Sequence, residues 1–196
     1  MHKGRMEAFS DGVFAIIVTI MVLEMRPPEE STFASLKPVL PVFLSYLLSF
    51  VYLGIYWSNH HHLLQAVQHV NGRILWANLH LLFWLSLVPF VTHWLGEHWR
   101  SPVPVAMYGA VMVGAATAYT ILTRSLIRHH GKGSSLAMAV GRDAKGLLSL
   151  LLYIAAIPLA FASTFAAIGV YVMLAIVWLV PDRRIERVFP AEAAGE

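Results

Sequence analysis

The chain has 196 residues, of which 58% are hydrophobic and only 13% are charged. Soluble domains carry roughly 25% charged residues, so this composition excludes a soluble globular protein and indicates an integral membrane protein. The net charge of +3 does not indicate a nucleic-acid partner, because the basic residues lie in loops beside apolar segments, as the positive-inside rule describes. The chain contains no cysteine, which excludes disulfides and thiolate metal sites.

The first apolar segment begins with a charged, hydroxyl-bearing head, residues 5–11, and continues as a lipid-like run from Gly12 to Leu23. A helix that spans a bilayer needs roughly 20 mostly apolar residues, and ionisable groups inside one are costly, so they are usually functional or paired. We expect this helix to end near Met25, because Pro27 and the proline after it cannot continue it. The long apolar run, followed by no small-residue cleavage site, argues against a cleavable signal peptide.

One face of this first helix carries a stripe of aliphatic side chains and one hydroxyl. Residues three or four apart share a helix face, and the stripe consists of Gly12, Ile16, Thr19, Ile20 and Leu23. Such a stripe suits a narrow, mostly dry ion path better than a water-filled tunnel. From the stripe alone, packing against another helix or against lipid is the commoner explanation, and a threonine in a helix more often bonds to a carbonyl of its own helix.

Five further apolar segments follow, and the sequence predicts a helix for each. Their expected ranges are 39–68, 73–95, 105–126, 146–162 and 164–180. The fourth helix is rich in glycine and alanine, which let helices approach closely, and residues 124–145 are expected to form a basic loop. We therefore expect an all-α integral membrane protein with six transmembrane helices in a single domain, residues 1–181, and a polar C-terminal tail, residues 182–196.

Lysine and arginine are distributed unevenly between the two ends of the predicted helices. With both termini on one side, that side holds Lys3, Arg5, Arg73, Arg124, Arg128, Lys132, Arg142, Lys145, Arg183, Arg184 and Arg187. The opposite side holds only Arg26, Lys37 and Arg100. This asymmetry predicts a multi-pass protein of the cell's inner (plasma) membrane with both termini in the cytoplasm.

The motif Arg5-x-x-x-Phe9-Ser10-Asp11 resembles the lysosomal potassium channel family, specifically its bacterial single-repeat members, in which the motif also heads the first helix. The similarity extends through all six spans and includes the Pro89-Phe90 pair near the end of the third. It implies a potassium-selective channel in which four first helices surround one axis. The animal members carry two repeats, whereas this chain carries one, so a four-fold assembly requires a homotetramer.

The resemblance also implies roles for individual residues. Ile16 matches the main hydrophobic constriction of the family, Thr19 matches its hydroxyl layer, and Ile20 and Leu23 match further aliphatic rings. The motif residues Arg5, Phe9, Ser10 and Asp11 match a network that hydrogen bonds hold against neighbouring helices, and its expected partners here are Trp76, Asn78 and nearby histidines. A helix-start ion pair between the charged motif residues is the simpler alternative.

The sequence contains no TVGYG-like loop, so it lacks the re-entrant carbonyl filter of ordinary potassium channels. A narrow aliphatic ring would instead favour the ion that loses its water more cheaply, which is potassium over sodium. Threonine hydroxyls one turn away could replace some of the lost water oxygens. We expect modest selectivity from this arrangement, a gate that closes by dewetting, and no cofactor apart from the permeant potassium ion.

Other functional classes are less well supported by the sequence. An enzyme is not expected, since there is no nucleophile elbow, no glycine-rich phosphate loop and no paired intramembrane carboxylate. A secondary transporter of a cation or of a proton-coupled substrate is the main alternative, although no broken-helix pair or inverted repeat stands out. A non-conducting membrane scaffold is a third possibility.

The histidine run His60-His61-His62 could indicate a metal site, but adjacent side chains on a helix point about 100° apart. Three consecutive histidines therefore cannot all bind one ion, and helical zinc pairs use i, i+4 spacing. We expect a pH-sensitive hydrogen-bond cluster instead, because histidine titrates near neutrality.

Overall fold

The computed structural model describes residues 3–179 except residues 68, 132 and 141–142. Within these residues the elements are α1 (Gly4–Leu23), the short 3-10 helix η1 (Phe33–Leu36), α2 (Leu40–Gln65), α3 (Gly72–Ser86), α4 (Val88–Glu97), α5 (Pro102–His130), α6 (Ser135–Val140), α7 (Ala144–Ala162) and α8 (Thr164–Leu179). The described part of the chain is all helical, as the sequence predicts. The expected helix ends at residues 68 and 180, and the tail 182–196, lie outside the described residues.

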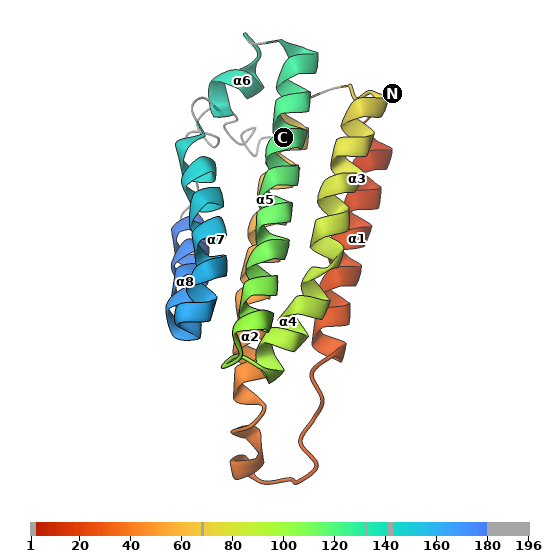
Figure 1. The fold of residues 1–196 in the computed structure, drawn as a ribbon. Helices are drawn as coiled ribbons and strands as arrows, with labels where there is room; N and C mark the ends of the chain where they lie inside the picture. Colours follow the sequence, from red (N-terminus) through yellow and green to blue (C-terminus); the bar gives the residue numbers. More distant parts are fainter. Residues whose placement is uncertain (1–2, 68, 132, 141–142, 180–196) are drawn as a thin grey trace.

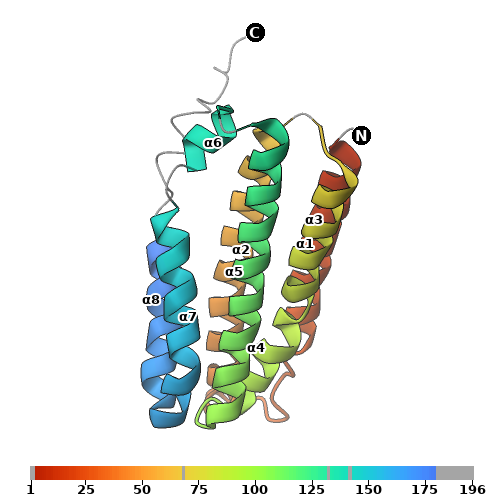
Figure 2. The same ribbon diagram turned by 45° about the horizontal axis from the view of Figure 1, so that its top comes forward.

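The long helices stand side by side in one bundle (Figures 1 and 2), in which α5 packs between α3 and α7, and α7 packs against α8. Helix α4 continues from the end of α3 and packs against α2 and α5, and α1 packs against α2, α3 and α4. The core contains large buried side chains contributed mainly by α2, α3 and α5, with Tyr108 of α5 and Tyr171 of α8 among the largest that are fully buried. This arrangement leaves α1 at one edge of the subunit, packed on its inner side only.

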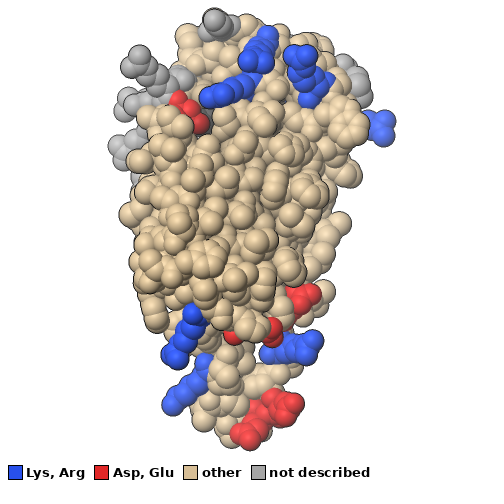
Figure 3. Space-filling model, in the orientation of Figure 1, with Lys and Arg blue, Asp and Glu red and all other residues tan. Residues whose placement is uncertain are grey.

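The surface carries a wide uncharged belt. In the face that Figure 3 shows, lysine, arginine, aspartate and glutamate gather at the two ends, and no charge interrupts the middle. Five described stretches are long and apolar enough to cross a bilayer, namely Gly4–Leu23, Leu40–Gln65, Gly72–Glu97, Pro102–His130 and Ala144–Ala162, and Thr164–Leu179 is a shorter apolar helix. The protein is therefore a multi-pass membrane protein.

The sequence predicts one helix over residues 73–95, and this prediction is wrong in that the helix is not continuous. The structure divides it into α3 and α4, with Leu87 between them. Pro89 lies in the first turn of α4, and because proline has no backbone N–H it cannot donate to the carbonyl of Leu85 four residues earlier. The two helices still form one apolar stretch, Gly72–Glu97, that is long enough to cross a membrane.

The predicted boundaries of the fourth helix and the following loop also need correction. Helix α5 starts at Pro102, a favourable first position for proline, and continues past residue 126 to His130. It stops at Gly131, whose φ of 92° lies in a region that favours glycine. The expected loop 124–145 thus contains the end of α5 and the short helix α6. Asp143 then caps α7 by accepting a hydrogen bond from the backbone N–H of Gly146 at 2.8 Å.

Candidate functional site

Helix α1 has one packed face and one exposed face. Its buried residues recur at helical spacing and are Met6, Ser10, Phe14, Ile17 and Met21. The residues predicted to line an ion path lie on the other side, where Ile16 is 59% exposed and Leu23 is 79% exposed in the single chain. Thr19 and Ile20 are exposed as well. A continuous apolar stripe of α1 is therefore not covered by its own subunit.

The hydroxyl of Thr19 bonds to its own helix, because Oγ1 donates to the carbonyl of Ile16 at 2.8 Å. This is the bond that an isolated helical threonine is expected to make. The bond uses the proton and leaves lone pairs of the oxygen free on the exposed face. The same side chain can thus be a local back-bonder and an oxygen ligand for a passing cation.

A buried chain of hydrogen bonds joins α1 to α2 and α3. Ser10 Oγ donates to the carbonyl of Met6 at 2.8 Å and accepts from Asn78 Nδ2 at 2.9 Å, and Asn78 Oδ1 lies 2.7 Å from His60 Nε2. Since the amide nitrogen of Asn78 donates to Ser10, its oxygen must accept from His60, which makes Nε2 the protonated ring nitrogen. Ser10, Asn78 and His60 are each at most 1% exposed. Every member of this chain has a partner, as buried polar groups require.

The acidic residue of the motif bonds to a tryptophan that sequence reasoning did not select. Trp57 Nε1 on α2 donates to Asp11 Oδ1 at 3.0 Å, and the ring of Trp57 stacks on His61 with centroids 6.0 Å apart. Trp76, which was expected in the network, is 75% exposed. Which of the two tryptophans, Trp57 on α2 or Trp76 on α3, reaches Asp11 depends on how each helix is rotated about its axis. Sequence spacing does not reveal this rotation.

The two remaining motif residues, Arg5 and Phe9, lie on the exposed side of α1. Within the described part of the chain, no ion pair joins Arg5 to Asp11 or to another carboxylate. The start of α1 is instead tied to α2 by Lys3, whose Nζ donates to the carbonyl of Leu64 at 2.7 Å. The same carbonyl also accepts from the backbone N–H of Val67, and lysine side chains commonly bond to the last carbonyls of a helix.

The residue after the far end of α1 lies near a histidine of α4. His93 Nδ1 lies 3.8 Å from Glu24 Oε2, directly after α1, and His93 Nε2 lies 3.4 Å from Glu97 Oε1. Sequence reasoning missed this contact, because the break at Leu87 sets the direction of α4. The start of α1 is therefore hydrogen-bonded to α2, its far end lies beside α4, and its middle stripe is exposed.

The three consecutive histidines have separate environments. His60 is in the buried chain, whereas His61 Nε2 lies 2.9 Å from Gln65 Nε2 and His61 Nδ1 lies 3.7 Å from Glu7 Oε1. Among the residues that the structure describes, no group of three or more His, Cys, Asp or Glu side chains is placed to hold a metal ion. His60 and His61 therefore bond to different side chains, Asn78 and Gln65, and His61 also lies near Glu7.

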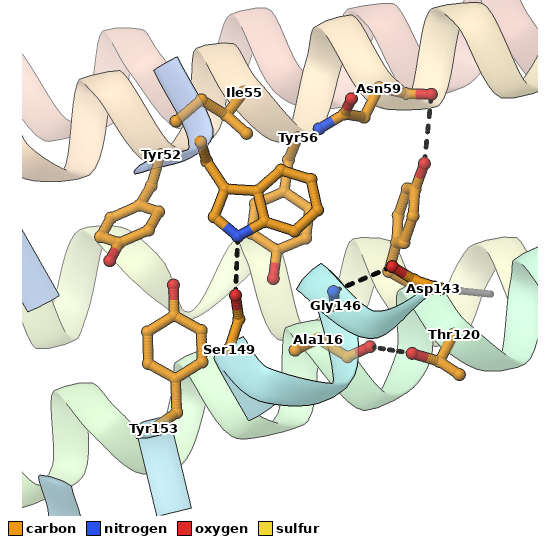
Figure 4. Close-up of a pocket in the computed structure, with 12 residues that line it drawn as sticks. Tyr52, Ile55, Tyr56, Asn59, Ala116, Thr120, Asp143, Gly146, Ser149 and Tyr153 are labelled. Carbon is orange, nitrogen blue, oxygen red and sulfur yellow. Dashed lines mark hydrogen bonds between the residues drawn. The ribbon is translucent and has the colours of Figure 1, made fainter. Parts of the chain in front are cut away.

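A pocket with an open volume of about 520 Å³ lies between α2, α5, α7 and the end of α8 (Figure 4). Its polar groups bond to one another or to nearby backbone: Trp178 Nε1 donates to Ser149 Oγ at 2.8 Å, and the hydroxyl of Tyr119 donates to the carbonyl of Asn59 at 3.2 Å. None of the residues described as lining it belongs to α1. It has no nucleophile paired with a base, so it does not resemble a catalytic centre.

Comparison with known proteins identifies relatives over nearly the whole chain. The family model for the endosomal/lysosomal potassium channel TMEM175 matches residues 5–89. A potassium channel of Chryseobacterium sp. (strain P1-3) is 54% identical over 187 residues, which cover 95% of this chain and 97% of the relative. The mouse endosomal/lysosomal proton channel TMEM175 is 27% identical over 182 residues, covering 84% of this chain and 36% of the relative.

A solved structure has the same fold. The crystal structure of a lysosomal potassium-selective channel TMEM175 homolog from Chamaesiphon minutus matches with a TM-score of 0.76 and 30% sequence identity. The match covers 93% of this chain and 97% of the solved chain. The matched relatives are named as channels and not as enzymes. On this identity and coverage, the chain belongs to the TMEM175 family of endosomal/lysosomal potassium channels.

Proposed function

We propose that this protein is a potassium-selective channel that conducts passively through a central pore lined by α1 of four identical subunits. One observation carries the proposal: the stripe Gly12, Ile16, Thr19, Ile20 and Leu23 is exposed in the single chain although the opposite face of α1 is packed. The names of the bacterial relatives, which describe potassium channels, support the choice of ion.

In the proposed assembly, residues 1–181 form one transmembrane domain with six spans in the cell's inner membrane. Both termini are cytoplasmic, because the counted lysines and arginines are concentrated on that side. The five long apolar stretches and the shorter helix α8 together account for six crossings. Asp11 then lies at the cytoplasmic mouth, and Leu23 lies toward the outer one.

The proposed roles of Ile16 and Thr19 follow from the chemistry of their side chains. Four converging Ile16 side chains offer an ion no oxygen, so pore width and wetting set the barrier there. Thr19, one turn away, offers an oxygen whose proton is already donated to the carbonyl of Ile16. Dehydration at the aliphatic ring favours potassium, and the threonine oxygens replace part of the lost hydration.

The test is the potassium/sodium permeability ratio, measured as a bi-ionic reversal potential with purified protein in bilayers. Ile16→Asn should wet the ring, raise conductance and lower the ratio. Thr19→Val keeps the shape but removes the oxygen, which is worth about 1 kcal/mol and therefore about a fivefold fall in the ratio. A transporter would instead show saturable, coupled flux without steady current.

Matched controls come from exposed residues far from α1. Ile154 on α7 is 47% exposed, and Thr117 on α5 is also exposed, so Ile154→Asn and Thr117→Val place the same changes on other surfaces. Val18 is unsuitable as a lipid-facing control, because it is partly buried and packs against the core. If the α1 variants give the same ratio as these controls, α1 does not line the conduction path.

A further inference from the structure

A long apolar groove separates α2 from α8 on the membrane-facing surface, and we name it the α2–α8 groove. Its open volume is about 1260 Å³, including the space at its open side. Its walls include Leu44, Leu48 and Val51 of α2 and Val172 and Ile176 of α8. Apart from Ser45 and the indole nitrogen of Trp99, the described residues that line it are apolar.

The length of the groove corresponds to one leaflet of a bilayer. Along α2 it extends from Leu40 to Val51, which at 1.5 Å per residue is about 16 Å. Half of the hydrocarbon core of a typical bilayer is about 15 Å. The groove therefore begins at the end of the bundle where α2 begins, reaches Leu179 at the end of α8, and is about as long as an acyl chain of one leaflet.

The end of the groove at the start of α2 is closed by an aromatic pair with a cation above it. Trp99 lines the groove and packs edge-on against Phe165 in the first turn of α8, with ring centroids 5.2 Å apart. The guanidinium carbon of Arg100 lies 4.6 Å from the centre of the Trp99 ring. Tryptophan and arginine are the side chains expected at headgroup level, where one part of the residue is apolar and the other is solvated.

A second basic residue, Lys37, is exposed and precedes α2, which forms the other wall of this end. Lys37 follows η1, and its carbonyl accepts a hydrogen bond from the backbone N–H of Leu40, which lines the groove. Within the described residues, neither Lys37 nor Arg100 has a carboxylate at ion-pair distance. Arg100 thus lies over the aromatic ring at the mouth of the groove, Lys37 lies three residues before Leu40, and neither forms an ion pair with a described carboxylate.

We propose that the α2–α8 groove binds an anionic diacyl phospholipid, with an acyl chain between α2 and α8 and its phosphate held by Arg100 and Lys37. Apolar walls alone would accept any lipid or a helix of another subunit. The two cations select a negatively charged headgroup, since attraction to anionic lipid amounts to about a fivefold gain in affinity per basic residue near the surface. A bound lipid of this kind joins the α7–α8 hairpin to α2. The proposal does not depend on ion conduction.

Native mass spectrometry of the purified assembly tests this proposal, with phosphatidylglycerol and phosphatidylcholine of identical acyl chains as probes. Phosphatidylglycerol should bind with the higher affinity. Arg100→Gln and Lys37→Gln should each weaken its binding about fivefold and leave phosphatidylcholine unchanged. Val172→Trp, which fills the groove from a position 41% exposed, should weaken binding of both lipids.

Two controls distinguish a specific lipid site from general attraction between basic residues and anionic lipid. Arg26→Gln removes a basic residue that the same end of the bundle carries outside the groove, and Ile154→Trp adds the same bulk to an exposed position of α7. Neither should change lipid binding. The proposal is overturned if Arg26→Gln weakens phosphatidylglycerol as much as Arg100→Gln does. It is also overturned if Val172→Trp leaves lipid binding unchanged and alters the subunit number, which would identify the groove as a subunit interface.

Discussion

Asn78 is the residue at which three helices are joined by side-chain hydrogen bonds. Its amide donates to Ser10 of α1 and accepts from His60 of α2, and both bonds are buried. An amide is well suited to this position, because it presents a donor and an acceptor on one rigid plane. The motif serine is thus fixed on the side of α1 opposite the exposed stripe, so the network sets the rotation of α1 without touching the candidate ion path.

Replacing Asn78 with leucine should destabilise the protein by about 1–3 kcal/mol, because it leaves the buried Nε2 of His60 without a partner and removes the hydrogen bond that Ser10 Oγ accepts. We expect a lower midpoint in thermal unfolding of the detergent-solubilised protein. Leu79→Ala, at an exposed neighbouring position of α3, is the control and should change the midpoint little. Ser10→Ala added to Asn78→Leu should cost less than the two single changes together, and strict additivity would show that the two residues do not act as one network.

Glycine positions show how closely the helices approach one another. A Cβ added at Gly114 of α5 would overlap the ring of Trp84 of α3, and one added at Gly96 of α4 would lie 2.7 Å from the Cα of Val42 of α2. Trp84 is also fixed by donating from Nε1 to His80 Nε2 at 3.0 Å, so its ring has little freedom to move aside. The small residues of α5 thus allow α3, the helix that carries Asn78, to pack closely against α5.

Gly114→Ala should therefore destabilise the bundle by about 1–3 kcal/mol, the range for overpacking a tight contact. The matched control is Gly54→Ala in α2, where an added Cβ meets nothing within 4 Å. That control should stabilise the protein by about 0.5–1 kcal/mol, since alanine favours a helix over glycine. Chemical unfolding of both variants checks the prediction. Equal effects of the two changes on stability would contradict the close packing of Trp84 against Gly114.

At the scale of the whole molecule, the charged and the apolar surfaces of the subunit are separated. Charges are concentrated at the two ends, an uncharged belt lies between them, and α1 stands at one edge with a bare apolar stripe. A single α1 provides only one wall, so it encloses no path for an ion. A cyclic assembly that places identical stripes around an axis supplies the remaining walls and covers the exposed residues.

The purified protein in detergent should have a protein mass of four times the 21.8 kDa chain, as measured by light scattering with the detergent contribution subtracted. The reason for this expectation is the four-fold cyclic arrangement of first helices that the resemblance to the family implies. Ile154→Asn, on the exposed side of α7, should leave the mass unchanged, whereas a charge at the stripe, Ile16→Asp, should reduce it. A stable monomer that still conducts would contradict the proposed assembly.

Much of this architecture is present in the sequence. Composition and apolar runs predict an all-α membrane protein, and the structure finds a helix in each of the six predicted segments. The spacing of Ile16, Thr19, Ile20 and Leu23 predicts a shared face because helical period depends only on the chain itself. The break after Ser86 also had a signal in Pro89, since the cause is a missing N–H within the same segment.

Only the tertiary structure decided which side chains of other helices each helix face contacts. Trp57 and Trp76 are similar in type and both lie on membrane helices, but Trp57 reaches Asp11 while Trp76 is exposed. The contact between Glu24 and His93 likewise depends on the direction in which α4 leaves the break at Leu87. Periodicity fixes a side chain relative to its own helix axis. The neighbour on that face depends on how helices distant in sequence rotate and pack together, which is a property of the whole core.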